Sequence, residues 1–316
     1  MTPDLENDLE RVIVFRSPRV EDRDKLRRQG RLLQLPCRHC VGCRLAKSRE
    51  WANRSVMEQV YHQDSWFLTL TYDDEHLPRS YPVDESTGEI ISVHSTLVKR
   101  HVQDFLKRLR FHTGQQFRYF CAGEYGTQTY RPHYHLLLFG LKLNDLSIIS
   151  KNFAGQPYYV SDMITKCWPD GIHILGPVTW QSASYVAQYT MKKATHGFDR
   201  SFYQAAAIQP EFQSMSLKPG IGYQYFVDHP DLFQYDTFSV STPQGGRKMV
   251  PPEYFKKKFK ELYPHEYLKR SLSVRLNADV KFHLKLMLTD KDYYDILKDE
   301  ERKAFSTLSC LTRDDI

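Results

Sequence analysis

The chain has 316 residues and a formal net charge of +6, and 41% of its residues are hydrophobic. This composition is that of a soluble globular protein with a sizeable core. No apolar stretch approaches the length of a membrane span, and the acidic start MTPDLENDLE does not have the pattern of a signal peptide. We therefore expect a cytoplasmic protein that has no membrane partner.

Positive charge is concentrated in two stretches of the sequence. Residues 16–54 contain twelve Lys or Arg against four acidic residues, and residues 247–275 contain nine against three. Basic stretches of this kind often bind the phosphate backbone of a nucleic acid. A solvated charged surface has the same composition, so the charge alone does not decide between the two.

The first motif in the chain is PCRHCVGCR, in which Cys37, Cys40 and Cys43 stand three residues apart. These cysteines lie too close together in sequence to form a disulfide scaffold, and a metal is the better explanation. Three thiolates make a candidate structural zinc site, and Zn²⁺ takes four ligands. The candidates for the fourth ligand include His39, Cys121 and Cys167. The alternative is three reduced cysteines at the start of a helix.

The elements that follow are predicted to alternate between helices and strands. They are a helix over 44–62, a strand over 65–72, a helix over 95–112 with Ser95 as its N-cap candidate, a strand over 117–124, a strand within 131–140, and a helix over 182–193. The two strands that follow each other across a short turn predict an antiparallel pair. This order indicates an α+β fold with a central antiparallel sheet and flanking helices.

The C-terminal part of the sequence is rich in Gly and Pro and predicts loops, followed by helices near 251–263 and 278–304. We therefore divide the chain into three predicted parts. They are an N-terminal basic segment with the cysteine cluster (1–45), an α+β domain (46–195), and a C-terminal loop-rich and helical region (196–316).

The segment RPHYHLLLFG contains two histidines at the start of an apolar run. In an extended strand, His133 and His135 point to the same face. Glu124 ends the preceding strand, and pairing of the two strands would bring its carboxylate near the imidazoles. Two His and one carboxylate with open positions make a catalytic type of metal site. The alternative is that these are ordinary packing residues and a solvated acid.

Tyr185 and Tyr189 stand four residues apart in the predicted helix YVAQYTMKK, so both phenols lie on one helix face. Lys192 and Lys193 follow within a turn of Tyr189, where they could lower the pKa of a phenol or hold a phosphate. A phenol is a poor nucleophile without such help. Pairs of this spacing also occur elsewhere in this Tyr-rich chain as packing.

These motifs, taken together, resemble a known family. The order FLTLTY, E…RPHYH and YVAQYTMKK is similar to the three motifs of the HUH endonucleases, in the two-tyrosine branch of the rolling-circle replication initiators. The cysteine motif PCRHCVGCR, GEYG…RPHYH and KPGIGYQYF resemble the initiators of gokushoviruses, which are single-stranded DNA phages of the microvirus family. The resemblance covers residues 36–230 approximately.

The resemblance implies a sheet of the RRM or ferredoxin-like type in an endonuclease domain. It implies that His133, His135 and Glu124 hold Mg²⁺ or Mn²⁺, and that Tyr185 or Tyr189 attacks the origin DNA to leave a 5′-phosphotyrosine. It further implies single-stranded or origin DNA as the partner, a host helicase and polymerase, and the cytoplasm of a bacterial host.

Three alternatives remain open from the sequence. A plasmid relaxase or transposase would use the same chemistry on another DNA. A zinc-stabilised DNA-binding protein without catalysis would use the histidines and tyrosines for packing. A metal-dependent phosphoesterase would cleave DNA with water and form no covalent adduct.

Overall fold

The computed structural model describes residues 36–37, 40–126, 129–151, 155–192, 200–242, 245–291 and 293–311. The chain divides into two compact units, Met1–Arg38 and His39–Ile316, and the elements below belong to the second unit. In the described part of the chain, no helix is both long and apolar enough to cross a membrane.

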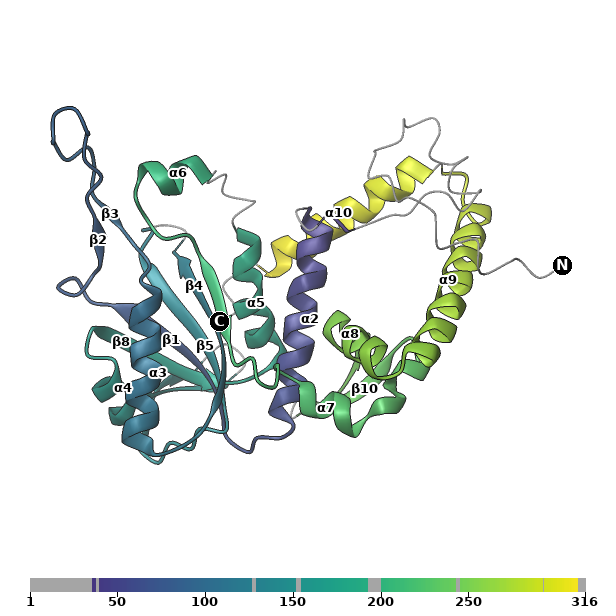
Figure 1. The fold of residues 1–316 in the computed structure, drawn as a ribbon, viewed down its shortest axis with the longest axis horizontal. Coiled ribbons are helices and arrows are strands. Elements are labelled where there is room, and N and C mark those ends of the chain that lie inside the picture. The colour runs from purple at the N-terminus through teal and green to yellow at the C-terminus, as the bar shows by residue number, and fades with distance from the viewer. Residues whose placement is uncertain are drawn as a thin grey trace. The chain divides into compact units, whose positions relative to one another are not determined.

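A seven-stranded antiparallel sheet forms the centre of the second unit (Figure 1). Its strand order is β6-β7-β8-β1-β5-β4-β9. The strands span Ser65–Tyr72 (β1), Arg118–Tyr125 (β4), Pro132–Phe139 (β5), Leu146–Lys151 (β6), Pro157–Ser161 (β7), Gly171–Pro177 (β8) and Phe212–Met215 (β9). The predicted α+β class with a central antiparallel sheet is confirmed.

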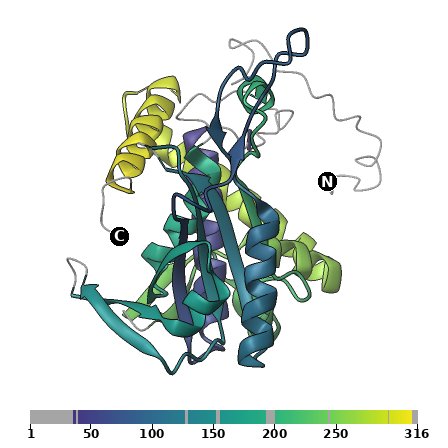
Figure 2. The ribbon, with the colours of Figure 1, turned by 90° about the vertical axis from the view of Figure 1, so that its left-hand side faces the viewer.

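The sheet is covered by helices on both faces, as Figures 1 and 2 show. Helices α3 (Lys99–Thr113) and α4 (Asp162–Cys167) cover one face, and α2 (Val41–Gln59) and α5 (Trp180–Lys192) cover the other. Two separate apolar cores result. We call the first the α3 face of the sheet and the second the α5 face.

Strand β5 shows why one sequence supplies both cores. Tyr134, Leu136 and Leu138 are buried on the α3 face, whereas Leu137 and Phe139 are buried on the α5 face. Successive side chains of a strand point to opposite faces, so the apolar run LLLF is explained by burial on both sides. The prediction of a central strand is confirmed, since β5 lies between β1 and β4.

Helix α3 begins three residues later than a local cap at Ser95 would place it. Ser95 lies in the short strand β3 (His94–Ser95), which pairs with β2 (Arg79–Ser80) in an arm that projects from the sheet in Figure 2. The N-cap is Val98, whose N–H donates to Tyr134 Oη at 2.8 Å. The Ser95 prediction was wrong because a tertiary hydrogen bond, and not a neighbouring side chain, fixes this helix start.

The C-terminal region forms a third core around the far half of α2. It contains α6 (Arg200–Ala205), α7 (Tyr223–Asp228), a 3₁₀ turn (Pro230–Gln234), β10 (Phe238–Thr242), β11 (Gly245–Met249), α8 (Glu253–Leu262), α9 (Pro264–Met287) and α10 (Tyr293–Leu311). Val56 and Met57 of α2 pack against the residues of α7 and α8 in this core. The predicted helix over 278–304 was wrong, because α9 starts at Pro264 and ends before a break that precedes α10.

A buried charged network joins α2 to the motif KPGIGYQYF. Glu58 accepts hydrogen bonds from Arg118 and, at 2.6 Å, from the N–H of Gly222. Burial raises the pKa of Glu58, but hydrogen bonds from His62 and Gly222 and the charge of Arg118 outweigh it, so the net pKa is lowered. The network keeps this carboxylate ionised and fixes the C-terminal region to α2.

Arg54 is the second buried charge of α2. Its guanidinium lies 4.1 Å from the ring centroids of both Trp51 and Tyr254, and its Nε donates to the carbonyl of Ile221 at 3.0 Å. Burial lowers the pKa of Arg54 to about 10. Gly222 has a φ of +75°, and an added Cβ would lie 3.0 Å from the Arg54 carbonyl oxygen, so a glycine is required at this contact.

Candidate active site

Strand register brings the predicted metal ligands onto one face of the sheet. Glu124 of β4 lies opposite His133 of β5, and Ala122 lies opposite His135. On the other side of β5, Thr69 lies opposite His135. Residues directly opposite in an antiparallel pair point to the same face, so all of these side chains lie on the α5 face.

Glu124 and His135 form a buried pair at the centre of this group. Glu124 Oε1 lies 3.0 Å from His135 Nε2, and the residues are 3% and 5% exposed. Thr69 Oγ1 lies 3.0 Å from His135 Nδ1, so both ring nitrogens have a partner. If Nε2–H donates to the carboxylate, Nδ1 accepts from the threonine hydroxyl, and the imidazole is neutral.

His133 lies one position nearer the end of the strand and is less buried. Its ring centroid is 6.4 Å from that of His135. An added Cβ at Gly126 would lie 2.8 Å from His133 Nε2, so the glycine of the turn after β4 leaves room for this imidazole. Glu124, His133 and His135 do not all bring ligand atoms within 4.8 Å of one another; among the described residues only a cysteine group does so.

Arg131, the first residue of RPHYH, holds the start of β5 against the end of β1. Its guanidinium donates to the carbonyl of Tyr72 at 2.9 Å and to Asp74 Oδ1 at 2.6 Å. These bonds tie together the strand ends that carry His133 and Thr71, which lie opposite each other. The arginine of the motif therefore has a positioning role.

Tyr185 of α5 lies directly against the histidine. Its ring centroid is 5.2 Å from that of His135, with the two planes at 82°. Phe67 stacks on His135 at 5.8 Å and meets Tyr185 edge-on at 6.3 Å. Tyr185 is half-buried, and its helix is held against α2 by Ser48 Oγ, which donates to the carbonyl of Ser184 at 3.1 Å.

The other predicted residues of this helix are described less fully. Tyr189 and Lys192 lie within α5, but their side chains are outside the part of the chain that the structure describes. Lys193 lies outside the described residues altogether. The roles of these three residues stay predictions.

Tyr134 is the hydrophobic residue between the two histidines, and it points away from them. Its hydroxyl lies 2.8 Å from the hydroxyl of Tyr72 and accepts from the N–H of Val98, on the α3 face. Burial raises the pKa of Tyr134 to about 12. This phenol therefore serves the fold and is not a candidate nucleophile.

Gln213 is a residue of this face that the sequence did not indicate. It lies in the edge strand β9, opposite Ala122, and its neighbour on the same face, Met215, packs into the core under α5. Its diagonal neighbour across the strand pair is Glu124, at about 7–8 Å between Cα atoms. The amide nitrogen of Gln213 is buried and has no hydrogen-bond partner within the described residues. Only the pairing of β9 with β4 could have shown this.

The cysteine cluster lies at the N-terminal end of α2. The sulfur atoms of Cys37, Cys40 and Cys43 lie within 4.8 Å of one another, which suits a shared metal. Two of the suggested fourth ligands do not fit. Cys121 and Cys167 are buried in the core of the α3 face, and burial raises the pKa of both thiols. His39 lies outside the described residues.

The donor set of the α5 face fits a divalent cation. Two imidazoles and a carboxylate offer N and O ligands, and the Glu124–His135 pair already has the spacing of groups that share one ion or proton. Thr69 at Nδ1 of His135 is the kind of outer partner that orients a histidine ligand. His133 would complete the set by a side-chain rotation toward the pair.

The comparisons with known proteins agree with this site. A family model described as a replication-associated protein of the ORF2 type matches residues 65–194. The replication-associated protein ORF2 of Spiroplasma virus 4 is 32% identical over 287 residues, which cover 88% of this chain and 85% of that protein. The replication-associated protein VP4 of Bdellovibrio phage phiMH2K is 32% identical over 247 residues, or 77% of this chain and 73% of the relative. No solved structure gives a significant match.

The chain belongs to the family of phage replication-associated proteins. The resemblance to the rolling-circle initiators of gokushovirus-like phages is thereby confirmed, and the protein has a role in phage replication. The matched segment 65–194 runs from β1 to the end of α5, so it contains all the candidate ligands of the α5 face and both tyrosines.

Proposed function

We propose that this protein nicks the origin of a circular phage DNA with a tyrosine and later rejoins the strand. The observation that carries the proposal is the packing of Tyr185 against His135, which in turn contacts Glu124. A candidate nucleophile and a candidate metal site thus share one sheet face, which is the arrangement that a covalent phosphoryl transfer needs.

Glu124, His133 and His135 would hold Mg²⁺ or Mn²⁺, which when bound polarises the scissile phosphate and neutralises its charge. Thr69 keeps the His135 ring oriented so that Nε2 faces the site. Phe67 and Tyr185 exclude water from one side of that imidazole. The amide of Gln213 is placed to donate to a phosphate oxygen on the β9 side of the site.

In the chemical step, the oxygen of Tyr185 or Tyr189 attacks the phosphorus, and the phenol proton passes to solvent. The bond from phosphorus to the 3′-oxygen breaks, and this oxygen leaves as a hydroxyl after taking up a proton. The 5′-phosphate stays on the tyrosine, so one phosphodiester replaces another and the strand can be resealed by the reverse attack. Lys192 and Lys193 would supply positive charge near the tyrosines.

Further parts of the proposal concern partners. The free 3′-hydroxyl is a primer for a host polymerase, and copying a duplex from a nick needs a helicase, so we infer both as partners in the cytoplasm of a bacterial host. The basic stretches of the chain would track single-stranded or origin DNA. The cysteine group would hold a structural Zn²⁺, with a fourth ligand other than Cys121 or Cys167.

A denaturing gel tests the proposal directly. End-labelled single-stranded phage DNA is incubated with Mn²⁺ and wild type, Tyr185→Phe, Tyr189→Phe or the double variant, with the exposed Tyr235→Phe as a matched control. We expect a metal-dependent protein–DNA band that survives in Tyr235→Phe and is absent from the double variant. Cut DNA without an adduct would make water the nucleophile. Shifted but uncut DNA would leave a binding protein; either result overturns the proposal.

A further inference from the structure

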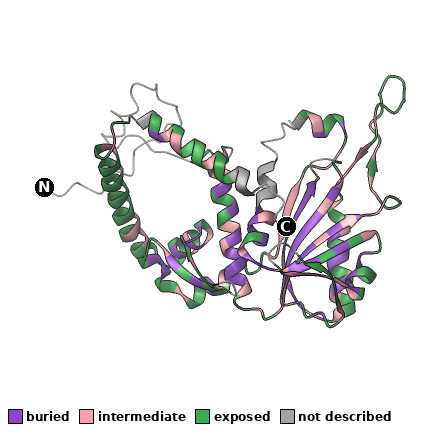
Figure 3. Ribbon diagram, turned by 180° about the vertical axis from the view of Figure 1, so that it is seen from behind, coloured by how far each residue is buried: buried purple, intermediate pink, exposed green. Residues whose placement is uncertain are grey.

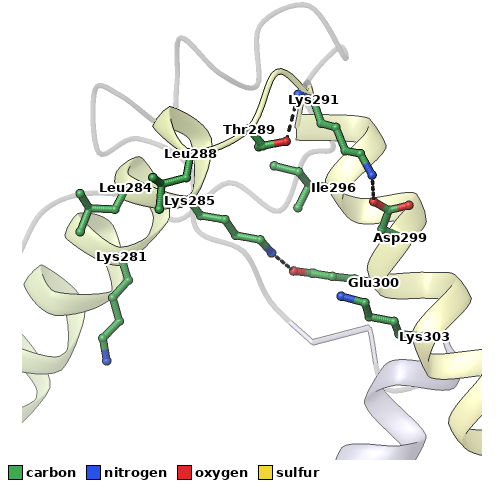
Figure 4. Close-up of a pocket in the computed structure, with 10 residues that line it drawn as sticks. All are labelled: Lys281, Leu284, Lys285, Leu288, Thr289, Lys291, Ile296, Asp299, Glu300 and Lys303. Carbon is green, nitrogen blue, oxygen red and sulfur yellow. Dashed lines mark hydrogen bonds and ion pairs between the residues drawn. The ribbon is translucent and has the colours of Figure 1, made fainter.

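Helix α9 turns its charged side toward its own chain. Arg270 and Lys281 pair with Asp236 at 2.6 and 3.6 Å, and Lys285 pairs with Glu300 of α10. Figure 4 shows Lys285 and Lys291 reaching Glu300 and Asp299 across a cavity between α9 and α10. The side of α9 that faces the rest of the molecule is therefore held by ion pairs and not by an apolar core.

The other side of α9 is aliphatic and exposed. Figure 3 shows the helix as exposed along most of its length. Its aliphatic residues and their exposed fractions are Leu268 (57%), Leu272 (49%), Leu276 (66%), Val280 (58%), Leu284 (51%) and Met287 (82%). At roughly 100° per residue, Leu272, Leu276, Val280 and Met287 fall within an arc about 80° wide. We call this arc and its two flanking leucines the aliphatic face of α9.

Such a face needs a partner of a particular kind. A helix of this length extends about 36 Å, and an apolar row of that length rarely stays in water on a soluble protein. Single-stranded DNA is a poor occupant, because bases stack on aromatic rings and none of the residues of the face is aromatic. A second apolar helix is the better match.

The spacing of the face points to a second copy of the same helix. Leu272 and Val280 lie four residues on either side of Leu276, and Leu268 and Leu284 lie eight residues on either side. An antiparallel pair with its two-fold axis at Leu276 would therefore place every aliphatic residue of this row opposite another. An interface of this kind uses the same patch on both subunits.

The charges at the edge of the face suit the same arrangement. Arg275 and Asp279 lie on one flank, four residues apart, and neither takes part in an ion pair among the described residues. In an antiparallel pair the same flanks of the two helices meet. Arg275 would then lie near Asp279 of the partner subunit, and the symmetric contact would repeat it.

We propose that this protein forms a two-fold dimer through antiparallel pairing of the aliphatic faces of two α9 helices. A contact made by one helix from each subunit lies at the small end of specific interfaces, so we expect a Kd of about 1–100 µM. The proposal does not depend on the nicking chemistry, and its test measures mass and not cleavage.

Sedimentation velocity of the full chain, at concentrations from about 1 to 200 µM, tests the proposal. Val280→Asp places a carboxylate in the aliphatic face, and Val274→Asp is the same change on the opposite side of the same helix, where Val274 is 42% exposed. We expect wild type and Val274→Asp to dimerise with increasing concentration, and Val280→Asp to stay monomeric. Monomeric wild type, or a Val280→Asp dimer, would overturn the proposal.

A charge swap covers the case in which Val280→Asp disturbs the helix, which far-UV circular dichroism would show. Arg275→Asp leaves only acidic groups where the two flanks meet, so the Kd should rise at least tenfold. Adding Asp279→Arg restores opposite charges with the order reversed, and dimerisation should return. If the double variant is as weak as the single variant, the antiparallel arrangement is wrong.

Discussion

The two faces of the sheet use buried polar groups in different ways. On the α3 face, the hydroxyls of Tyr72 and Tyr134 bond to each other, to His101 and to the backbone at Val98. On the α5 face, Glu124, His135 and Thr69 bond to one another within an apolar core that also holds Phe67 and Tyr185. The same strands supply both sets, because their side chains alternate.

The difference separates residues that maintain the fold from residues that could perform chemistry. Hydroxyl groups bonded to a helix start stabilise one arrangement and have no further valence for a ligand. A carboxylate and an imidazole can exchange their mutual hydrogen bond for a cation without moving far. Substitutions on the two faces should therefore affect different measurements.

The largest effect is expected for Glu124→Gln. The amide keeps the shape of the side chain but loses its charge, so metal-dependent nicking should fall by about 10³-fold or more. Unfolding by denaturant should change little, since Gln can still bond to His135. The exposed Glu253→Gln is the control and should behave as wild type. Full activity in Glu124→Gln would remove this carboxylate from the site.

A smaller and opposite pattern is expected for Tyr134→Phe on the α3 face. Loss of the hydroxyl leaves the buried N–H of Val98 without its acceptor, so the free energy of unfolding should fall by about 1–3 kcal/mol. The denaturant midpoint measures this loss. Nicking per folded molecule should stay unchanged, and a large drop in it would contradict the division between the two faces.

Gln213→Leu sharpens the comparison on the α5 face. Leucine fills the same space without a donor, so a lost hydrogen bond to DNA should lower kcat/KM for nicking about tenfold. Stability should be unchanged or slightly increased, because a buried amide nitrogen without a partner is removed. Reduced stability with full activity would show that Gln213 serves the fold instead.

The smallest effect concerns the buried histidine of the α3 side, His173. Its Nε2 accepts from the N–H of Ser161 at 3.0 Å, and burial lowers its pKa. The unfolded chain binds the proton more readily, so stability is full above the unfolded pKa of about 6.5 and declines as the pH falls through it. His173→Gln keeps an acceptor but does not titrate. Its melting temperature should vary less between about pH 8 and 5 than that of wild type.

Much of the candidate site could be predicted because its residues follow local patterns. Alternation along β1 and β5 gave the faces of Thr69, His133 and His135, and the short turn gave the pairing with Glu124. The contact of Tyr185 with His135 could not be derived from spacing, since it depends on where α5 lies over the sheet. The resemblance to the initiator family supplied that link.

The unpredicted elements depend on contacts between distant residues. Strand β8 pairs with β1, about a hundred residues earlier, and Ile172 and Ile174 are 65% and 39% exposed, which hides its pattern. Gly171 is needed there because an added Cβ would lie 2.1 Å from the carbonyl oxygen of Thr71. Strand β9 has only four residues, so Gln213 carried no pattern of its own.

Helix α2 belongs to two cores at once, and this limits how the protein can be shortened. Ala52 packs under the sheet with α5, while Val56 and Met57 pack with α7 and α8. A fragment that stops near residue 195 would lose β9 from the sheet and bare the far half of α2 to water. The smallest autonomous nuclease should therefore retain the chain through Phe259, so any truncation series is best started from that end of α8.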